Sequence, residues 1–167
     1  ASDDGTTGYS FQQPSGMVRV PHDPMLNPGD RPITISTHLR VAADLPVGDY
    51  NVLEKGTATA SGGAYKLEIH ATRRDSPKFG FPDCAFNGAA GQNRVYGPKS
   101  IADGQWHTVV CRLTATQAYV TVDGRSGKAV ARQVTTIANT VDLTVGAKPD
   151  GKHGYVGDAD EVSISIG

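Results

Sequence analysis

The sequence has few of the features that mark membrane proteins, redox proteins and nucleic-acid-binding proteins. Its 167 residues contain no apolar run of about 18 residues, which excludes a transmembrane helix. An excess of charge of one sign is missing too, because 16 Lys and Arg stand against 17 Asp and Glu, so no strong field favours nucleic acid or an anionic membrane. The length is that of one ordinary domain, and we expect a single domain over residues 1–167, with 1–8 as a frayed tail or linker remnant.

Helical periodicity is also absent. No window shows the apolar spacing of an amphipathic helix with a capping signal, whereas apolar and polar residues alternate in many segments. In 33–41, for example, Ile33, Ile35, Leu39 and Val41 share one face. Turn signals separate such segments at the spacing expected of a β-sandwich or barrel, so the fold class is all-β. The expected strands are 17–20, 33–41, 50–55, 64–70, 78–84, 94–97, 106–114, 118–122, 130–134, 141–145 and 160–166.

Two Asp-Gly pairs mark tight turns between these strands. Asp123-Gly124 predicts a hairpin that joins a strand ending at Val122 to one beginning near Val130. Asp103-Gly104 marks a turn directly before Trp106, the only tryptophan. A single Trp beside a turn in an all-β chain is more often a core residue than a platform for sugar, so we expect Trp106 in the core.

Only two cysteines are present, and they lack the C-x-x-C spacing of a redox or zinc motif. Cys84 and Cys111 both lie in strand-like segments, which leaves a single disulfide or two buried thiols, and we expect the disulfide. The Ala-Ser-Asp-Asp start is what cleavage after a secretory signal leaves, although an engineered start would look the same.

Four segments carry a family signature in the right order. They are V-R-V-P-H-D-P-M-L-N-P at 18–28, L-E-K-G at 53–56, D-G-Q-W-H-T-V at 103–109 and G-D-A-D-E-V-S-I at 157–164. Together they resemble the bacterial laminin G-like, concanavalin A-like jelly-roll domains, and the resemblance runs from Tyr9 to Ile166. It implies a two-sheet antiparallel β-sandwich. Members of that family serve as carbohydrate-binding modules, lectins, adhesion or protein-interaction modules, and hydrolases or lyases, so the fold alone does not give the function.

Catalytic patterns are missing from this chain. The jelly-roll glucanases carry their acids on one strand as E-x-D-x-x-E, and here the nearest acids are Asp158 and Asp160 without a third in phase. The five histidines show no H-x-H or H-x-x-x-H spacing, and G-x-S-x-G is absent. We therefore expect a secreted or cell-surface binding module without catalytic residues, with a glycan as the favoured partner. The alternatives are a protein-interaction or adhesion module of a larger surface protein and, less favoured, a polysaccharide hydrolase or lyase.

Candidate ligand-binding residues are two tyrosines, an arginine and a histidine. Tyr96 and Tyr155 come at loop edges, and Arg94 lies beside Tyr96. His70 ends the segment Lys66-Leu-Glu-Ile-His, in which Lys66, Glu68 and His70 share a face. The plainer interpretation of this face is a solvated surface. Aromatic residues make up only 7% of the chain, which leaves few for a stacking platform once the core is filled.

The resemblance further implies one structural calcium ion. We expect Asp160, with Asp158, to join it to backbone oxygens of the N-terminal segment, because the first and last strands of this architecture pair. The alternative is an Asp160 held by hydrogen bonds alone. A second place is the loop 146–151, but Lys148 stands where pentraxin-like relatives keep an acid, which weakens that site.

Overall fold

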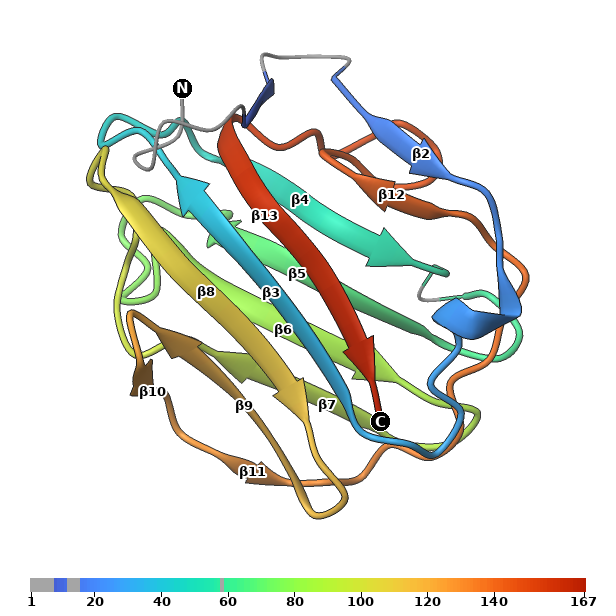
Figure 1. Ribbon diagram of the computed structural model, residues 1–167. Coiled ribbons are helices and arrows are strands. Elements are labelled where there is room, and N and C mark those ends of the chain that lie inside the picture. The colour runs from blue at the N-terminus through green and yellow to red at the C-terminus, as the bar shows by residue number, and fades with distance from the viewer. Residues whose placement is uncertain (1–7, 12–15, 58) are drawn as a thin grey trace.

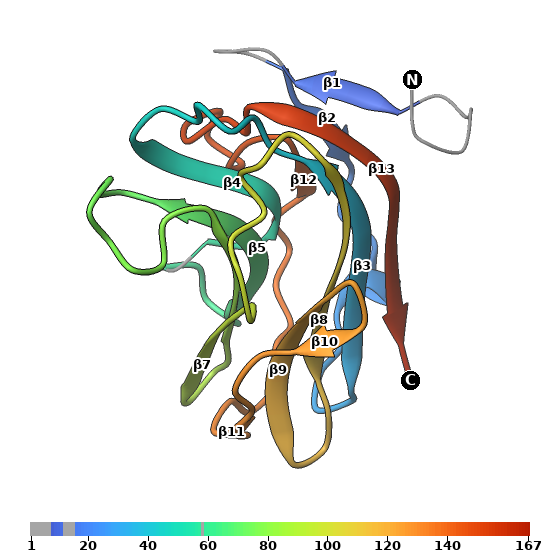
Figure 2. The same cartoon turned by 90° about the vertical axis from the view of Figure 1, so that its left-hand side faces the viewer.

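A computed structural model describes residues 8–11, 16–57 and 59–167, so the expected tail at 1–8 lies outside the described residues except for Gly8. Two antiparallel sheets pack face to face as a sandwich (Figures 1 and 2), which confirms the predicted fold class. Within the described part of the chain, no helix is long and apolar enough to cross a membrane.

The strands divide into a seven-stranded and a six-stranded sheet. The seven-stranded sheet has the order β1 (Tyr9–Phe11), β13 (Gly157–Ile166), β3 (Ile33–Arg40), β8 (Trp106–Leu113), β9 (Gln117–Val122) and β10 (Arg125–Ser126), with β11 (Val130–Ala131) also paired to β9. The six-stranded sheet has the order β2 (Val18–Val20), β12 (Leu143–Val145), β4 (Gly48–Lys55), β5 (Ala64–Ala71), β6 (Phe81–Asn87) and β7 (Gln92–Tyr96). A 3-10 turn, η1 (Pro24–Leu26), follows β2.

Strand positions follow the predicted alternation, and the differences lie at turns. In β3 the buried and half-buried residues alternate strictly, with Ile33 and Ile35 in the core. The segment predicted at 78–84 begins later, as β6, because residues 76–81 turn, with the Phe79 N–H donating to the Ser76 carbonyl. The strand predicted at 130–134 shortens to β11, and the short strands β1 and β10 were not predicted as strands.

The predicted disulfide is confirmed and ties the two sheets together. Cys84 on β6 bonds to Cys111 on β8, and both residues are fully buried in the core. The bond closes a loop over a sequence separation of 27 residues. By the loop-entropy relation, such a crosslink stabilises the fold by about 3.5 kcal/mol.

The Asp-Gly turns are joined by a buried histidine. Asp123 and Gly124 have φ of 50° and 76°, as a two-residue hairpin turn requires, so the predicted turn is confirmed. The strand that pairs with Val122 begins at Arg125 and not near Val130, whereas Val130 pairs with Ala118. His107 Nδ1 lies 2.8 Å from Asp123 Oδ2, and its Nε2 lies 3.1 Å from Asp103 Oδ1. His107 therefore clamps both turns to the start of β8.

The expectation that Trp106 lies in the core is wrong. In strand β8 the side chains of Val109 and Cys111 point inward. Trp106 belongs to the alternate set of residues, so its side chain points away from the core. There its ring lies 5.2 Å from the Arg40 guanidinium and 5.8 Å from the His38 ring. The aromatic ring is half-buried by these two neighbours on the outer face of the seven-stranded sheet.

Candidate binding face on the six-stranded sheet

The outer face of the six-stranded sheet, which points away from the other sheet, is polar. On β5 the buried residues Tyr65 and Leu67 face the core, while Lys66, Glu68 and His70 face outward. The predicted sharing of one face by these three residues is confirmed. Unlike an ordinary solvated face, this one holds charged residues that are almost inaccessible, since Glu68 is only 2% exposed.

Cross-strand register sets the polar residues in rows across four strands. Asn51 on β4 pairs with Glu68, Glu68 with Asp83 on β6, and Asp83 with Tyr96 on β7. The neighbouring rows run through Glu54, Lys66, Ala85 and Arg94, and through Asp49, His70 and Phe81. We call the polar members of these rows the polar face: Asp49, Asn51, Glu54, Lys66, Glu68, His70, Asp83, Arg94 and Tyr96.

Ion pairs bind the centre of the polar face. Arg94 Nη2 lies 2.9 Å from Asp83 Oδ2 and 3.2 Å from Glu68 Oε2. Lys66 Nζ lies 2.6 Å from Glu68 Oε1. Because the side chains of Asp83 and Glu68 are 0% and 2% exposed, removal of a cationic partner would leave a buried, uncompensated carboxylate.

Burial alters the ionisation of this face. It raises the pKa of Glu54 to about 7, although Lys66 and Lys148 oppose the shift. Burial also raises the pKa of Asp83 above its ordinary value, in spite of Arg94. The pKa of His70 is lowered by burial and by the nearby Arg94 and Lys78. Burial therefore favours the neutral forms of Glu54, Asp83 and His70.

Several buried polar atoms of the polar face have no hydrogen-bond partner in the described part of the chain. They are both amide atoms of Asn51, Glu54 Oε2, Glu68 Oε1 and Asp83 Oδ1. Glu68 Oε1 still has its ion pair with Lys66, whose geometry is not that of a hydrogen bond. Buried polar atoms in proteins are nearly always paired with protein, water or ligand, so this face keeps hydrogen-bonding capacity.

A basic cleft opens where the polar face ends at β7. Lys78 Nζ lies 3.5 Å from the Tyr96 ring centroid, and the His70 ring meets Tyr96 edge-on at 5.7 Å. Beside Tyr96 lies a cavity of about 490 Å³ whose lining includes Lys78, Arg94 and Lys128 and no carboxylate. Gly127 also lines the cavity, and a Cβ atom at this position would lie 2.3 Å from the Tyr96 carbonyl oxygen. The cleft therefore suits a polar or anionic group.

At the opposite end, a histidine in the left-handed conformation borders the polar face. His153 has φ of 54°, and its Nδ1 lies 2.8 Å from Asp49 Oδ2. Lys148 Nζ lies 3.7 Å from the same oxygen, so two cationic groups share one carboxylate when His153 is protonated. A cavity of about 470 Å³ lies beside His153, Asp49 and Tyr50.

Sequence comparison decides the family of this sandwich. A laminin G family model, described as the concanavalin A-like lectin/glucanases superfamily, matches residues 12–165. The chain belongs to this superfamily. Its laminin G-like fold recurs in the mouse laminin α1 chain, domains LG4-5, with a TM-score of 0.73 and 16% identity over 99% of this chain and 44% of that one.

Two further solved structures resemble this laminin G-like domain. The native heptameric SAP-like pentraxin from Limulus polyphemus has a TM-score of 0.63 and 15% identity, over 93% of this chain and 73% of that one. The LG1-3 region of the laminin α2 chain has a TM-score of 0.62 and 13% identity, over 94% and 30%. The chain thus spans less than half the length of either laminin structure, and at these identities the likeness concerns the fold alone. No curated protein matches the chain.

The domain brings three of the four predicted ligand residues together, since His70, Arg94 and Tyr96 all lie on the polar face. Tyr155 lies elsewhere. It is 2% exposed, packs against Phe11 at 5.9 Å between ring centroids, and its hydroxyl lies within hydrogen-bond distance of the Arg40 and Asp158 carbonyls. We expected an exposed loop edge, but the Tyr155 N–H donates to the Gly146 carbonyl and the ring enters the core.

The predicted calcium ligands lie beside the expected strand pair, because β1 does pair with β13. Arg40 Nε and Nη2 lie 2.7 Å and 2.6 Å from Asp158 Oδ2, so a guanidinium already neutralises this carboxylate. Asp160 Oδ1 accepts a hydrogen bond from the Glu161 N–H. No group of three or more His, Cys, Asp or Glu suited to a metal occurs among the described residues. Asp158 does not fit an ion that needs about six to eight oxygens, and calcium stays a prediction.

Proposed function

We propose that this laminin G-like domain is a non-catalytic extracellular module that binds a glycan at the polar face, with Tyr96 and the basic cleft as the main contact. The observation that carries the proposal is the convergence of His70, Arg94 and Tyr96 on a face with unpaired buried polar atoms. Secretion or display on a cell surface agrees with the disulfide, since such bonds persist in oxidising compartments.

Sugars suit a surface of this kind because their hydroxyl groups both donate and accept hydrogen bonds. The polar face offers cationic donors and the Tyr96 ring to a ligand, above carboxylates that are buried. Its rows cross β4, β5, β6 and β7, which at about 4.8 Å per strand span roughly 14 Å, so an elongated ligand lying across the strands meets several residues.

The burial of the carboxylates supports a binding role. Asp83, Glu68 and Glu54 are at most 3% exposed, so the accessible contacts are His70, Arg94, Tyr96 and Lys78 above them. A glycosidase needs two carboxyl groups that reach the scissile bond. In this domain the carboxylates instead hold the cationic side chains in position.

The proposal is tested by affinity electrophoresis and co-sedimentation with neutral, uronic and sulfated polysaccharides, in calcium and in chelator. We expect Tyr96→Ala and Lys78→Ala to weaken retention by about tenfold, equivalent to about 1.4 kcal/mol. Tyr119→Ala is the matched control, because Tyr119 lies near Arg112 in the seven-stranded sheet, at 5.9 Å. Equal loss in the control, or no retention on any polysaccharide, contradicts the proposal. Release of soluble sugar contradicts its non-catalytic part.

A further inference from the structure

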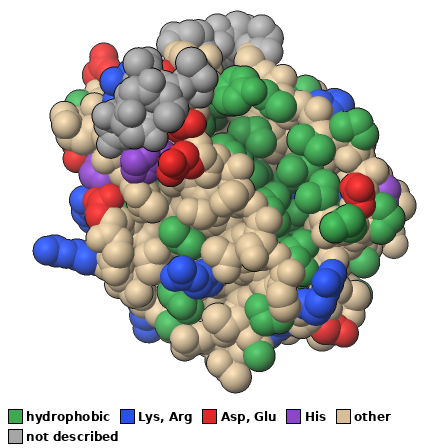
Figure 3. Space-filling model, viewed as in Figure 1, with side chains coloured by type: hydrophobic (Ala, Val, Ile, Leu, Met, Phe, Trp, Pro, Cys, Tyr) green, Lys and Arg blue, Asp and Glu red, His purple; other side chains and the backbone are tan. Residues whose placement is uncertain are grey.

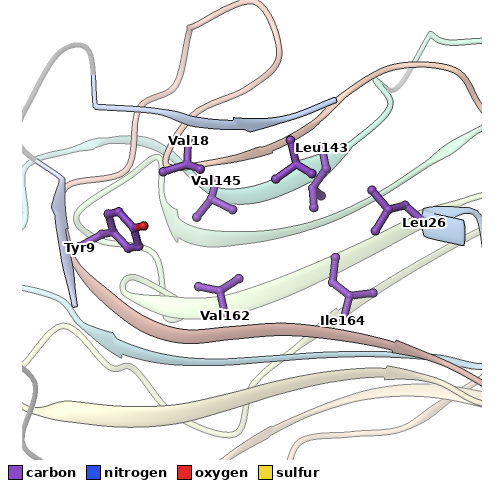
Figure 4. A pocket seen from close by; sticks show the side chains of 8 residues that line it. Tyr9, Val18, Leu26, Leu143, Val145, Val162 and Ile164 are labelled. Atoms are coloured by element: carbon purple, nitrogen blue, oxygen red, sulfur yellow. The ribbon is translucent and has the colours of Figure 1, made fainter. Parts of the chain in front are cut away.

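Apolar side chains lie open to solvent at one edge of the sandwich, between β13 on one sheet and β2 and β12 on the other (Figures 3 and 4). They form a hollow of about 300 Å³. A second hollow of about 310 Å³ shares Leu26 and Ile164 with the first and reaches Arg31. We call the two together the apolar groove, lined by Tyr9, Val18, Val20, Met25, Leu26, Arg31, Leu143, Val145, Val162, Ile164 and Ile166.

The groove is open because only the short strand β1 lies beyond β13 at this edge of the seven-stranded sheet. Strand β1 pairs with β13 only at 157–159, and no described strand pairs with the same edge of β13 from Glu161 to Ile166. Strands β12 and β2 of the other sheet extend beyond β13 in Figure 1. Along the free edge, Val162, Ile164 and Ile166 face the groove while Ser163 and Ser165 are exposed.

We propose that the apolar groove receives one extended segment of another protein chain, which adds a strand to β13 and places alternate apolar side chains between the two sheets. A free strand edge supplies main-chain hydrogen bonds, and pockets for alternate side chains supply selectivity. Edge strands that avoid such pairing carry charges, Pro or a bulge; the bulge of β13 lies between Asp160 and Ser163, and 163–166 contains neither a charge nor Pro.

Charges at the two ends of the groove define the segment further. Arg31 lies at the end near Ile166, and the exposed Glu161 lies at the other end of the free edge. Two nitrogens of Arg31 bind the Pro28 and Asn27 carbonyls, which fixes the guanidinium there. A segment antiparallel to β13 passes Arg31 first, so an acidic residue at its start and a basic residue at its end complement the groove.

A second copy of the chain fits the groove less well. If two β13 edges paired about a two-fold axis, the two six-stranded sheets would approach in one layer. Because β12 and β2 project beyond β13 in each copy, they would collide there (Figure 1). A single extended segment meets no such obstacle.

The experiment uses a labelled, capped peptide, Asp-Val-Thr-Val-Thr-Val-Lys, and a second peptide with its end charges exchanged. Fluorescence anisotropy measures binding to the whole domain, and amide hydrogen exchange locates it. We expect saturable binding of the first peptide and slower exchange in 162–166. The variant Arg31→Glu should reverse the preference between the two peptides, by about tenfold each way. Arg125→Glu is the control, because Arg125 is exposed on β10 at the opposite edge of the sheet.

Each other result overturns the proposal. Absence of binding by the first peptide does so, and so does protection at another surface. A dimer in sedimentation velocity that Arg31→Glu dissociates assigns the groove to a second copy. Binding of dodecanoate without binding of peptide assigns it to a small amphiphile. Tyr96→Ala should leave peptide binding unchanged, so this inference and the glycan proposal fail separately.

Discussion

The polar face and the apolar groove belong to the same sandwich, but they differ in what remains unsatisfied. The polar face has polar atoms without hydrogen-bond partners, and the apolar groove has hydrophobic side chains exposed to solvent. On the polar face, carboxylates and cations are packed together and covered, so what is missing there is hydrogen-bond partners. In the apolar groove, hydrophobic side chains lie open beside a free strand edge, so what is missing there is cover. Buried charges depend on each other for the stability of the fold, whereas open apolar side chains have little to lose on substitution.

The comparison is tested most strongly by Arg94→Leu. This change leaves Asp83 and Glu68 buried with one cation fewer, which should lower the free energy of unfolding by about 3 kcal/mol, the lower end of the usual range because the Arg94 side chain is 39% exposed. Urea unfolding at pH 8 measures the loss. The double variant with Asp83→Asn should recover part of it, and a double variant as unstable as Arg94→Leu alone contradicts the ion-pair explanation.

The next largest effect is a pH dependence caused by Glu54. Its pKa in the folded protein, about 7, lies above its ordinary value of 4.5, so the folded state binds this proton more tightly. That contribution to stability is fully present below about pH 4.5 and is lost as pH rises through 7, to a total of about 3 kcal/mol. Glu54→Gln should therefore be more stable than the parent at pH 8.5 and similar to it at pH 4.5.

Urea unfolding across this pH range checks the Glu54 prediction. Glu161→Gln is the control, since Glu161 is an exposed glutamate on β13. We expect this substitution to change the free energy of unfolding by less than about 0.5 kcal/mol, because the side chain is exposed. A parallel curve for Glu54→Gln as well would show that Glu54 is ordinarily ionised in the folded state.

Alternation was enough to predict which residues of β3 and β5 face inward, because one face of each strand is apolar. Alternation did not predict that the buried residues Asn51 and Glu54 of β4 both lie on the polar face. Asn51 and Glu54 are three residues apart and would lie on opposite faces of a regular strand. A bulge between Asn51 and Leu53 brings both to the outer face, and nothing in the local sequence marks it.

The cluster of acids on the polar face leaves no pattern within a single strand. Glu54, Glu68 and Asp83 come from β4, β5 and β6 and meet only through cross-strand register. Trp106 shows a related difficulty. Both sets of alternating residues in β8 contain apolar members, so alternation alone does not decide which set faces inward, and Trp106 belongs to the outward set.

Ile164 in the apolar groove should give a smaller effect than its partner on the next strand. Ile164 on β13 pairs in register with Ile35 on β3, which is fully buried. We expect Ile35→Ala to cost about 4 kcal/mol and Ile164→Ala only about 1 kcal/mol, since Ile164 already contacts solvent. Thermal unfolding of both variants measures the difference. Equal losses would mean that the groove closes over Ile164 in solution.

The smallest expected effect on stability comes from substitutions of exposed apolar residues, which test peptide binding without a change in folding. Met25 is 81% exposed at one end of the apolar groove, and Val47, outside it, is 54% exposed. Met25→Lys and Val47→Lys should each change the free energy of unfolding by less than about 0.5 kcal/mol, because neither side chain is buried. If the groove takes an apolar segment, Met25→Lys alone should weaken the anisotropy signal of the peptide. Equal weakening by Val47→Lys would mean that the peptide adheres to any exposed apolar residue, and the difference between the two surfaces would disappear.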